Sequence, residues 1–221
     1  LIHREETQWS AFTYAWHADG SDAELVETPR TVDVFVHGAN VQWPLLSRGQ
    51  CDKCHVQDKG YALGLSVEQL TRSVRYNNTP ISQLGAWVDA GLASMSGTLP
   101  SAFPAPSSMP NDLDRQARTY LHVNCASCHQ PDGPGDAEID LRYHTAFSLM
   151  GLCNVVSDRD TLGIVGGLLL KPGQPEASIL YERMLRRDKH RMPPLGSDLA
   201  DAEGLRLIAD WIRAMETCPT D

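Results

Sequence analysis

Six cysteines are the residues of this sequence with the clearest chemistry, and four of them fall into two copies of one pattern. The copies read Cys51-Asp52-Lys53-Cys54-His55 and Cys125-Ala126-Ser127-Cys128-His129. Two thiols at this spacing can form thioether bonds to the two vinyl groups at one edge of a haem, and the adjacent histidine can ligate the iron. The sequence therefore predicts two covalently attached haems c, with His55 and His129 as proximal iron ligands.

The same cysteines have a second interpretation, because two Cys-x-x-Cys pairs could together form one four-thiolate zinc site. Zinc gives no reason for a histidine after both pairs, so the haem interpretation is favoured. Covalent haem attachment takes place beyond the cytoplasmic membrane, which predicts a periplasmic or extracellular protein. We expect Cys153 and Cys218 to form a disulfide there, the alternative being two unpaired buried thiols.

A methionine-containing loop suggests the ligand on the other side of the second iron. The segment Arg191-Met192-Pro193-Pro194-Leu195-Gly196 follows His129 by enough chain to wrap a haem, since Met192 lies 192 − 129 = 63 residues after it. The two prolines stiffen the loop and lower the entropy cost of holding a thioether at the iron. We therefore predict that Met192 is the distal ligand, and His–Met ligation raises the reduction potential.

The distal ligand of the first haem is predicted less sharply. Met95 is favoured, because it follows a predicted helix and lies 95 − 55 = 40 residues after His55. Met109 and His37 are alternatives, and so is an iron with no distal protein ligand. An open iron would let peroxide or another small molecule bind.

The elements that must position these residues are clearest in the second half of the chain. Asn111 is a candidate N-cap for a helix over 112–124 that runs directly into the second motif. A short helix is predicted around 177–187, and a final one begins near Asp201. The inward face of that final helix carries Ile208, Trp211, Ile212 and Met215.

The first fifty residues alternate as strands do, and no helical pattern leads into Cys51. Apolar residues alternate over 12–16, before an Asp19-Gly20 turn, over 23–25 after it, and again over 32–36. We interpret these runs as a small β layer that replaces the usual leading helix and covers one side of the first haem.

Two helices are predicted after the first motif. Ser66 and Gln69 form a capping box for a helix that ends near Arg75. Thr79 and Pro80 are typical of the start of a second helix. Its predicted inward face carries Ile81, Leu84, Val88 and Leu92. A Pro- and Ser-rich loop over 94–110 follows.

Together these elements predict a mainly α fold with class I cytochrome c-like haem domains in tandem and a small N-terminal β layer. The expected division is residues 1–110 for the β layer and first haem domain, and residues 111–221 for the second haem domain. We predict an electron carrier with no catalytic residues, because no acid–base pair stands out.

The amino-acid composition of the chain limits the kinds of partner that it can bind. The 221-residue chain has a formal net charge of −9, which argues against nucleic-acid binding and suits a redox partner with a basic surface. Its longest apolar stretch, residues 162–170, contains three glycines and is too short to span a membrane.

Several segments resemble a family of bacterial diheme cytochrome c proteins, some of them fused to secreted sugar-dehydrogenase-like domains. The resemblance rests on the following segments: "WPLLSRGQCDKCHVQDKGYALGLSVEQL", "ARTYLHVNCASCHQ", "DLRYHTAF", "KPGQPEASILYERML", "RMPPLG" and, near the start, "YAWHADGSDAELV". It covers nearly all of the chain and implies two covalent haems and an exported location, without specifying a substrate.

The predicted function is electron transfer between a donor and an acceptor outside the cytoplasm. A diheme peroxidase-like enzyme is one alternative, and it requires an open iron in the first haem. A subunit of an extracellular multihaem filament is another, in which self-assembly would continue the row of haems.

Overall fold

The computed structural model describes residues 2–5, 8–36, 38–56, 62–64, 66–98, 100–104 and 111–220. About 27% of the described residues are helical and 18% are in strands, and the strands form several small antiparallel sheets. The prediction of a mainly α fold made of tandem class I cytochrome c-like domains is therefore wrong. Part of the difference arises in the first half, where one hairpin takes the place of the end of one predicted helix and the start of the next.

Four two-stranded antiparallel sheets occur in the described residues, each pairing strands adjacent in sequence. They are β1 (Ile2–Glu5) with β2 (Gln8–Ala11), β3 (Tyr14–Trp16) with β4 (Ala23–Leu25), β5 (Arg30–Val36) with β6 (Ala39–Leu45), and β7 (Ser73–Tyr76) with β8 (Thr79–Ser82). The predicted alternation over 14–16, 23–25 and 32–36 is confirmed as strand. The strands pair as separate hairpins instead of one continuous layer.

Three short helices interrupt the hairpins of the first half. They are α1 (Arg48–Cys51), α2 (Val67–Leu70) and α3 (Gln83–Asp89). The predicted capping box is confirmed, since the N–H of Gln69 donates to Oγ of Ser66 at 3.3 Å. The helix itself ends at Leu70 instead of near Arg75, and strand β7 takes its place.

The helix predicted to begin at Thr79 and Pro80 is also wrong, because these two residues belong to strand β8. Helix α3 begins only after Ser82, whose Oγ accepts from the N–H of Gly85 at 3.1 Å. Leu84 is buried as predicted. The other three residues of the predicted inward face are exposed: Ile81, Val88 and Leu92.

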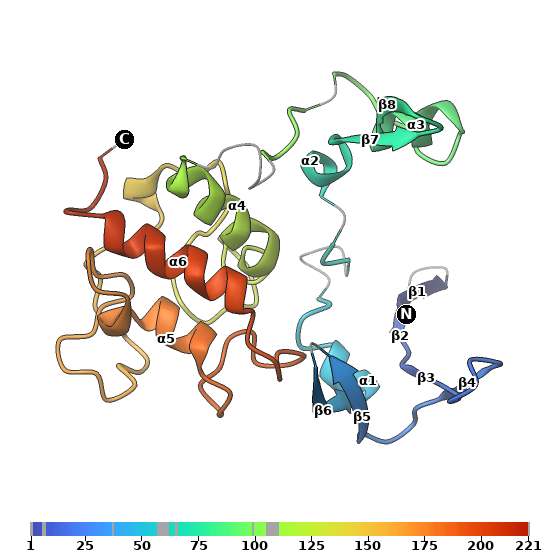
Figure 1. The fold of residues 1–221 in the computed structure, drawn as a ribbon, viewed down its shortest axis with the longest axis horizontal. Coiled ribbons are helices and arrows are strands. Elements are labelled where there is room, and N and C mark those ends of the chain that lie inside the picture. Colours follow the sequence, from blue (N-terminus) through green and yellow to red (C-terminus); the bar gives the residue numbers. More distant parts are fainter. Residues whose placement is uncertain are drawn as a thin grey trace.

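The second half is helical, as predicted. It contains α4 (Leu113–Cys125), the 3₁₀ turns η3 (Phe147–Leu149) and η4 (Pro175–Ala177), α5 (Ile179–Leu185) and α6 (Ala202–Ala214). Helix α4 is capped by Asp112, one residue after the predicted cap. Figure 1 shows α4, α5 and α6 packed together, with the hairpins and short helices lying to one side of them.

The main apolar core lies among these helices and the loops that join them. Its buried members are Ala117, Leu121, Ala126, Ile139, Leu141, Phe147, Met150, Leu152, Leu170, Ile208, Trp211, Ile212 and Met215. All four residues predicted for the inward face of the last helix are among them. Cys153 and Cys218 form the predicted disulfide, which ties the chain end after α6 to this core.

Helices α4 and α6 cross at a small residue. A Cβ added at Gly204 of α6 would collide with the phenol of Tyr120 on α4, so the absence of a side chain at Gly204 lets the two helices approach. The Tyr120 hydroxyl donates to Oδ2 of Asp201 at 3.0 Å. Trp211 Nε1–H on α6 also donates to Oδ1 of Asp114 at 3.1 Å.

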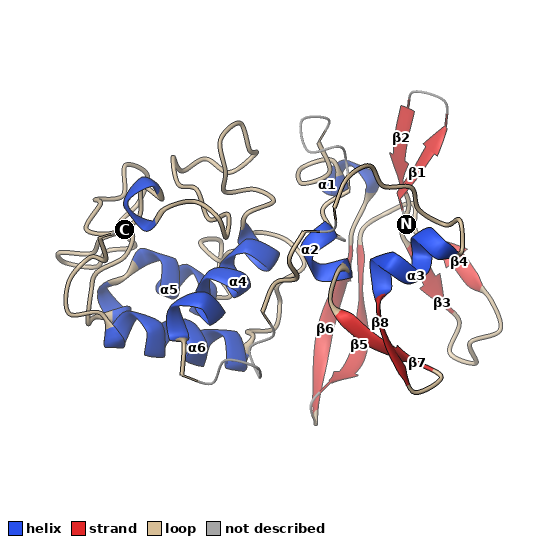
Figure 2. Ribbon diagram, turned by 90° about the horizontal axis from the view of Figure 1, so that it is seen from above, coloured by secondary structure: helices blue, strands red, loops and turns tan. Residues whose placement is uncertain are grey.

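Two views relate the halves of the chain. In both Figure 1 and Figure 2, α2 lies on the side of the first half that faces α4. Within the described ranges no helix is long and apolar enough to cross a membrane.

Candidate haem-attachment sites

Each Cys-x-x-Cys-His motif begins on the last residue of a helix. Helix α1 ends at Cys51 and α4 ends at Cys125. In the first motif the carbonyl of Cys51 accepts from the N–H of Cys54 at 3.1 Å and of His55 at 3.0 Å. In the second motif the corresponding distances are 3.1 Å and 2.9 Å. The two motifs therefore have the same local backbone structure, with the histidine one turn beyond the first cysteine.

The helix that leads into Cys51 was not predicted. Its signal was present, since Ser47 and Gln50 form a capping box in which Gln50 Oε1 accepts from the N–H of Ser47 at 2.9 Å. A single turn is too short to show apolar periodicity, which explains why the pattern was missed. The guanidinium of Arg48 lies 4.6 Å from the ring centre of Phe12, which holds α1 against the segment after β2.

The second cysteines of the two motifs interact across the chain. Burial raises the pKa of the Cys54 thiol, and a hydrogen bond with the Cys128 thiol raises it further. The two motifs, 74 residues apart in sequence (128 − 54 = 74), are thus neighbours in space. Among the described residues, no three His, Cys, Asp or Glu side chains are grouped so that they could hold one metal ion.

The environment of the second motif favours uncharged groups. Burial raises the pKa of the Cys125 thiol to about 12, so this sulfur is neutral at physiological pH. Burial also lowers the pKa of His129, and the nearby charge of Arg183 lowers it further. A neutral sulfur suits a thioether bond, and a neutral imidazole is the form that ligates a metal.

A tight loop holds His129 from one side. A Cβ added at Gly135 would lie 2.8 Å from Nδ1 of His129, and one added at Gly133 would collide with the Cys128 carbonyl. Nδ1 of His129 is buried and has no hydrogen-bond partner in the described structure. Because Nδ1 faces this glycine loop, Nε2 is the ring nitrogen that would ligate an iron. Two cysteines followed by a buried histidine at this spacing are the residue types that a covalently attached haem needs, so the residues present fit a haem.

The loop that carries Met192 approaches the same region through α5. Arg183, whose charge acts on His129, accepts a hydrogen bond at its carbonyl from the N–H of Met192 at 2.9 Å. The Arg183 guanidinium also donates to the carbonyl of His190 at 3.1 Å. Arg183 thus bonds the predicted distal methionine and acts electrostatically on the predicted proximal histidine. Nothing in the sequence distinguished Arg183, and its role was not predicted.

Polar contacts hold the loop that carries Met192 on several sides. Arg191 Nη1 lies 2.9 Å from Oδ1 of Asp198, and His190 Nδ1 lies 2.9 Å from Oδ2 of Asp160. Arg187 donates to the carbonyl of Leu199 at 3.1 Å and also bonds the carbonyl of Ser197. These contacts restrict the loop, which lowers the entropy cost of holding a thioether at an iron.

The candidates for the distal ligand of the first haem are less well placed. Met95 lies in the loop that follows α3, with 36% of its side chain exposed. Its position as a ligand stays a prediction. His37 and Met109 lie outside the described residues. His55, the predicted proximal ligand, is half-buried.

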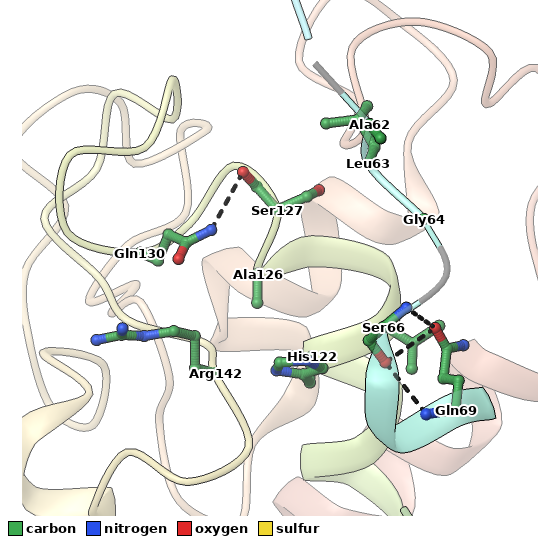
Figure 3. A pocket seen from close by; sticks show the side chains of 11 residues that line it. Ala62, Leu63, Gly64, Ser66, Gln69, His122, Ala126, Ser127, Gln130 and Arg142 are labelled. Carbon is green, nitrogen blue, oxygen red and sulfur yellow. Dashed lines mark hydrogen bonds between the residues drawn. The ribbon is translucent and has the colours of Figure 1, made fainter. Parts of the chain in front are cut away.

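A pocket of about 270 Å³ lies beside the second motif. Its lining from the first half consists of Ala62, Leu63, Gly64, Ser66 and Gln69, and its lining from the second half includes His122 and Arg142. Figure 3 shows Ala126 and Ser127, the residues between the second pair of cysteines, facing the capping box of Ser66 and Gln69 across it. This pocket lies between α2 and the second motif.

Comparison of the chain with protein-family models, with curated proteins and with solved structures finds no match. The family resemblance inferred from the motifs consequently stays a prediction.

Proposed function

We propose that this chain carries two covalently attached haems and transfers electrons between redox partners outside the cytoplasm. The observation that carries the proposal is the repeated local structure at the two motifs. In each, a helix ends on the first cysteine, and the carbonyl of that cysteine accepts from the second cysteine and the histidine. Such a repeat is expected if each motif performs the same task, and the Cys-x-x-Cys-His pattern is typical of haem c attachment.

Each residue has a defined role in this proposal. Cys51 and Cys54 would hold one haem, with His55 as its proximal ligand. Cys125, Cys128 and His129 would do the same for the other haem. Met192 would take the distal position of the second iron, and Met95 is the favoured distal ligand of the first. When bound, each haem supplies an iron that gains and loses single electrons.

The chain contributes ligand state and rigidity. Burial keeps His129 neutral and ready to ligate, and the packed glycine loop fixes its ring. The ion pair of Arg191 with Asp198 and the contact of His190 with Asp160 hold the Met192 loop, so little further conformational entropy is lost on ligation.

The location and the partner follow from charge and disulfide chemistry. The Cys153–Cys218 disulfide supports a location outside the cytoplasm, because disulfides persist in oxidising compartments. A net charge of −9, to which haem propionates would add, favours a donor or acceptor with a basic face.

Mass spectrometry of the denatured protein tests the proposal. We expect the mass of the chain plus two haems, and the loss of one haem in each of two double variants, Cys51→Ala with Cys54→Ala and Cys125→Ala with Cys128→Ala. The matched control, Cys153→Ser with Cys218→Ser, removes two cysteines outside the motifs and keeps both haems. A chain that binds zinc and carries no haem when expressed with a haem-attachment system would overturn the proposal.

A further inference from the structure

Phe103 joins the two halves of the chain through a small cluster of rings. Its ring centre lies 4.7 Å from that of His122 on α4 and 5.1 Å from that of Tyr143. His144 is 6.2 Å away and packs edge-on against Tyr143 at 5.0 Å. We call Phe103, His122, Tyr143 and His144 the aromatic seam.

The aromatic seam is linked to other parts of the first half besides Phe103. The N–H of Phe103 donates to the carbonyl of Glu68 in α2 at 3.3 Å. The residues that hold Phe103 therefore also hold α2. Ser66 and Gln69, at the start of α2, face His122 and Ala126 across the pocket beside the second motif. The seam therefore lies between the segment that follows the first motif and the helix that leads into the second.

His122 is the member of the seam whose protonation matters. Its Nδ1 accepts a hydrogen bond from the N–H of Tyr143 at 3.1 Å, which requires a lone pair on that nitrogen. Tyr143 is fixed in turn, because Arg115 Nε donates to its hydroxyl at 3.1 Å and Arg118 Nη2 to its carbonyl at 2.8 Å. A protonated His122 would present N–H at Nδ1 to another N–H, and this hydrogen bond would be lost.

The charges around His122 come from each element that packs on it. Burial is the largest cause that lowers its pKa, and the neighbouring His144 and Arg142 lower it further. Glu68 of α2 and Asp140 act in the opposite direction. Arg115 and Arg118, bound to Tyr143, add two more positive charges near the seam. A proton on His122 would thus enter a partly buried site that already has several cationic groups.

We propose that the packing of Phe103 on neutral His122 holds the first motif next to the second. We further propose that protonation of His122 weakens this packing. Because the pKa of His122 is lowered in the folded chain, the contribution of the seam is complete above the ordinary histidine value of 6.5 and is lost as the pH falls below it. The contact itself does not depend on the proposed function, although it would set how closely two haems approach.

Hydrogen exchange of the haem-loaded protein between pH 5 and pH 8, corrected for the intrinsic pH dependence, tests this inference. We expect peptides covering 66–70, 100–104 and 140–145 to lose protection severalfold below pH 6.5, while peptides from α6 keep theirs. In His122→Asn the amide oxygen can accept from the N–H of Tyr143 but cannot be protonated, so protection should not change with pH. His17→Asn, which replaces an exposed histidine after β3 that lies outside the seam, should behave like the parent.

Two outcomes would overturn the inference: a parent protein without this pH dependence, or the same dependence in His122→Asn. Phe103→Leu provides a second variant that keeps the apolar volume and loses the ring contacts. It should exchange faster than the parent in the 66–70 and 140–145 peptides at pH 8, and unchanged exchange there would also count against the seam. Counting the haems by mass in the same samples separates a failed seam from a failed proposal of haem attachment.

Discussion

At the scale of single residues, the carboxylate of Asp140 shows how a loop beside the second motif is fixed. Arg142 donates to it from Nε at 2.9 and 3.1 Å and from Nη2 at 2.6 Å, and Thr145 Oγ1 donates at 2.8 Å. These bonds, those from Arg142 foremost, lower the pKa of Asp140 from 3.8 to about 2. The ionised carboxylate thus holds the turn that also carries Tyr143.

We predict that this group stabilises the fold above its unfolded pKa of 3.8 and that the contribution is lost as the pH falls towards 2. The loss should be up to about 2 kcal/mol, reduced by solvent screening at the half-exposed Arg142. Urea unfolding at pH 5 and pH 2.5 should show this loss in the parent and a smaller one in Asp140→Asn. Asp89→Asn, at an exposed site on α3, serves as the control, and an equal loss in both variants would contradict the assignment.

A second prediction for a single residue concerns Gly135, which lies next to the His129 ring. Gly135→Ala places a methyl group 2.8 Å from Nδ1 of His129 and 2.9 Å from the Cys128 carbonyl, so the loop must shift. We expect a loss of about 1–3 kcal/mol in the free energy of unfolding, as for other overpacked sites. Gly49→Ala, in helix α1 with nothing within 4 Å of the added carbon, should instead be neutral or stabilising by up to about 1 kcal/mol. Equal effects of the two substitutions would show that His129 is not held from this side.

At the scale of the elements, Asp201 connects the start of α6 to α4. Its Oδ1 accepts from the N–H of Gly204 at 3.0 Å, which caps the helix, and its Oδ2 accepts from the Tyr120 hydroxyl at 3.0 Å. Burial, followed by the bond to Asp201, raises the pKa of Tyr120 well above its ordinary value. The phenol is therefore neutral and donates to the carboxylate.

Asp201→Ala should lower the free energy of unfolding by about 2–3 kcal/mol, because it removes a cap and leaves the Tyr120 hydroxyl without its acceptor. Tyr120→Phe removes only the bond between the helices and should cost about 1 kcal/mol. Chemical denaturation of both variants measures the difference. If Tyr120→Phe costs as much as Asp201→Ala, the cap contributes nothing and the assignment is wrong.

The elements that the sequence predicted well are those with several helical turns. Helix α4 and helix α6 repeat apolar residues over three turns and have aspartate caps, so periodicity and capping agree. The hairpin of β7 and β8 was missed because Thr79 and Pro80 match a helix start. The deciding signal was the pair Asn77 and Asn78, which both adopt positive φ (47° and 64°), as a tight hairpin turn requires. Pro80 is tolerated because each strand of a two-stranded hairpin is an edge strand.

Contacts between residues far apart in the chain could not be predicted from a single sequence. The disulfide could be predicted, because only two cysteines lie outside the two Cys-x-x-Cys-His motifs. The two haems stay a prediction. The packing of Phe103 on His122, the contact between Cys54 and Cys128, and the role of Arg183 could not. Each depends on how segments far apart in the chain pack together, and no local sequence pattern indicates that packing.

At the scale of the whole molecule, one covalent link closes the helical half. The Cys153–Cys218 disulfide spans 65 residues, including α5 and α6. Loop-closure entropy predicts that removing it costs about 4 kcal/mol in the free energy of unfolding. We expect Cys153→Ser with Cys218→Ser to show this loss in chemical denaturation while both haems stay attached. A stability equal to that of the parent would show that the packed helices need no link.

The central claim concerns the two motifs and their irons, and a redox-poised absorption spectrum with low-temperature EPR tests it most directly. We predict two low-spin haems in the oxidised protein, at least one with the weak near-infrared band of methionine bound to ferric iron. Met192→Ala should abolish that band at the second haem and lower its reduction potential, whereas Met184→Leu on α5 should leave both unchanged. A high-spin haem that binds cyanide or peroxide in the parent protein, or no haem at all, would contradict an electron carrier with two ligated irons.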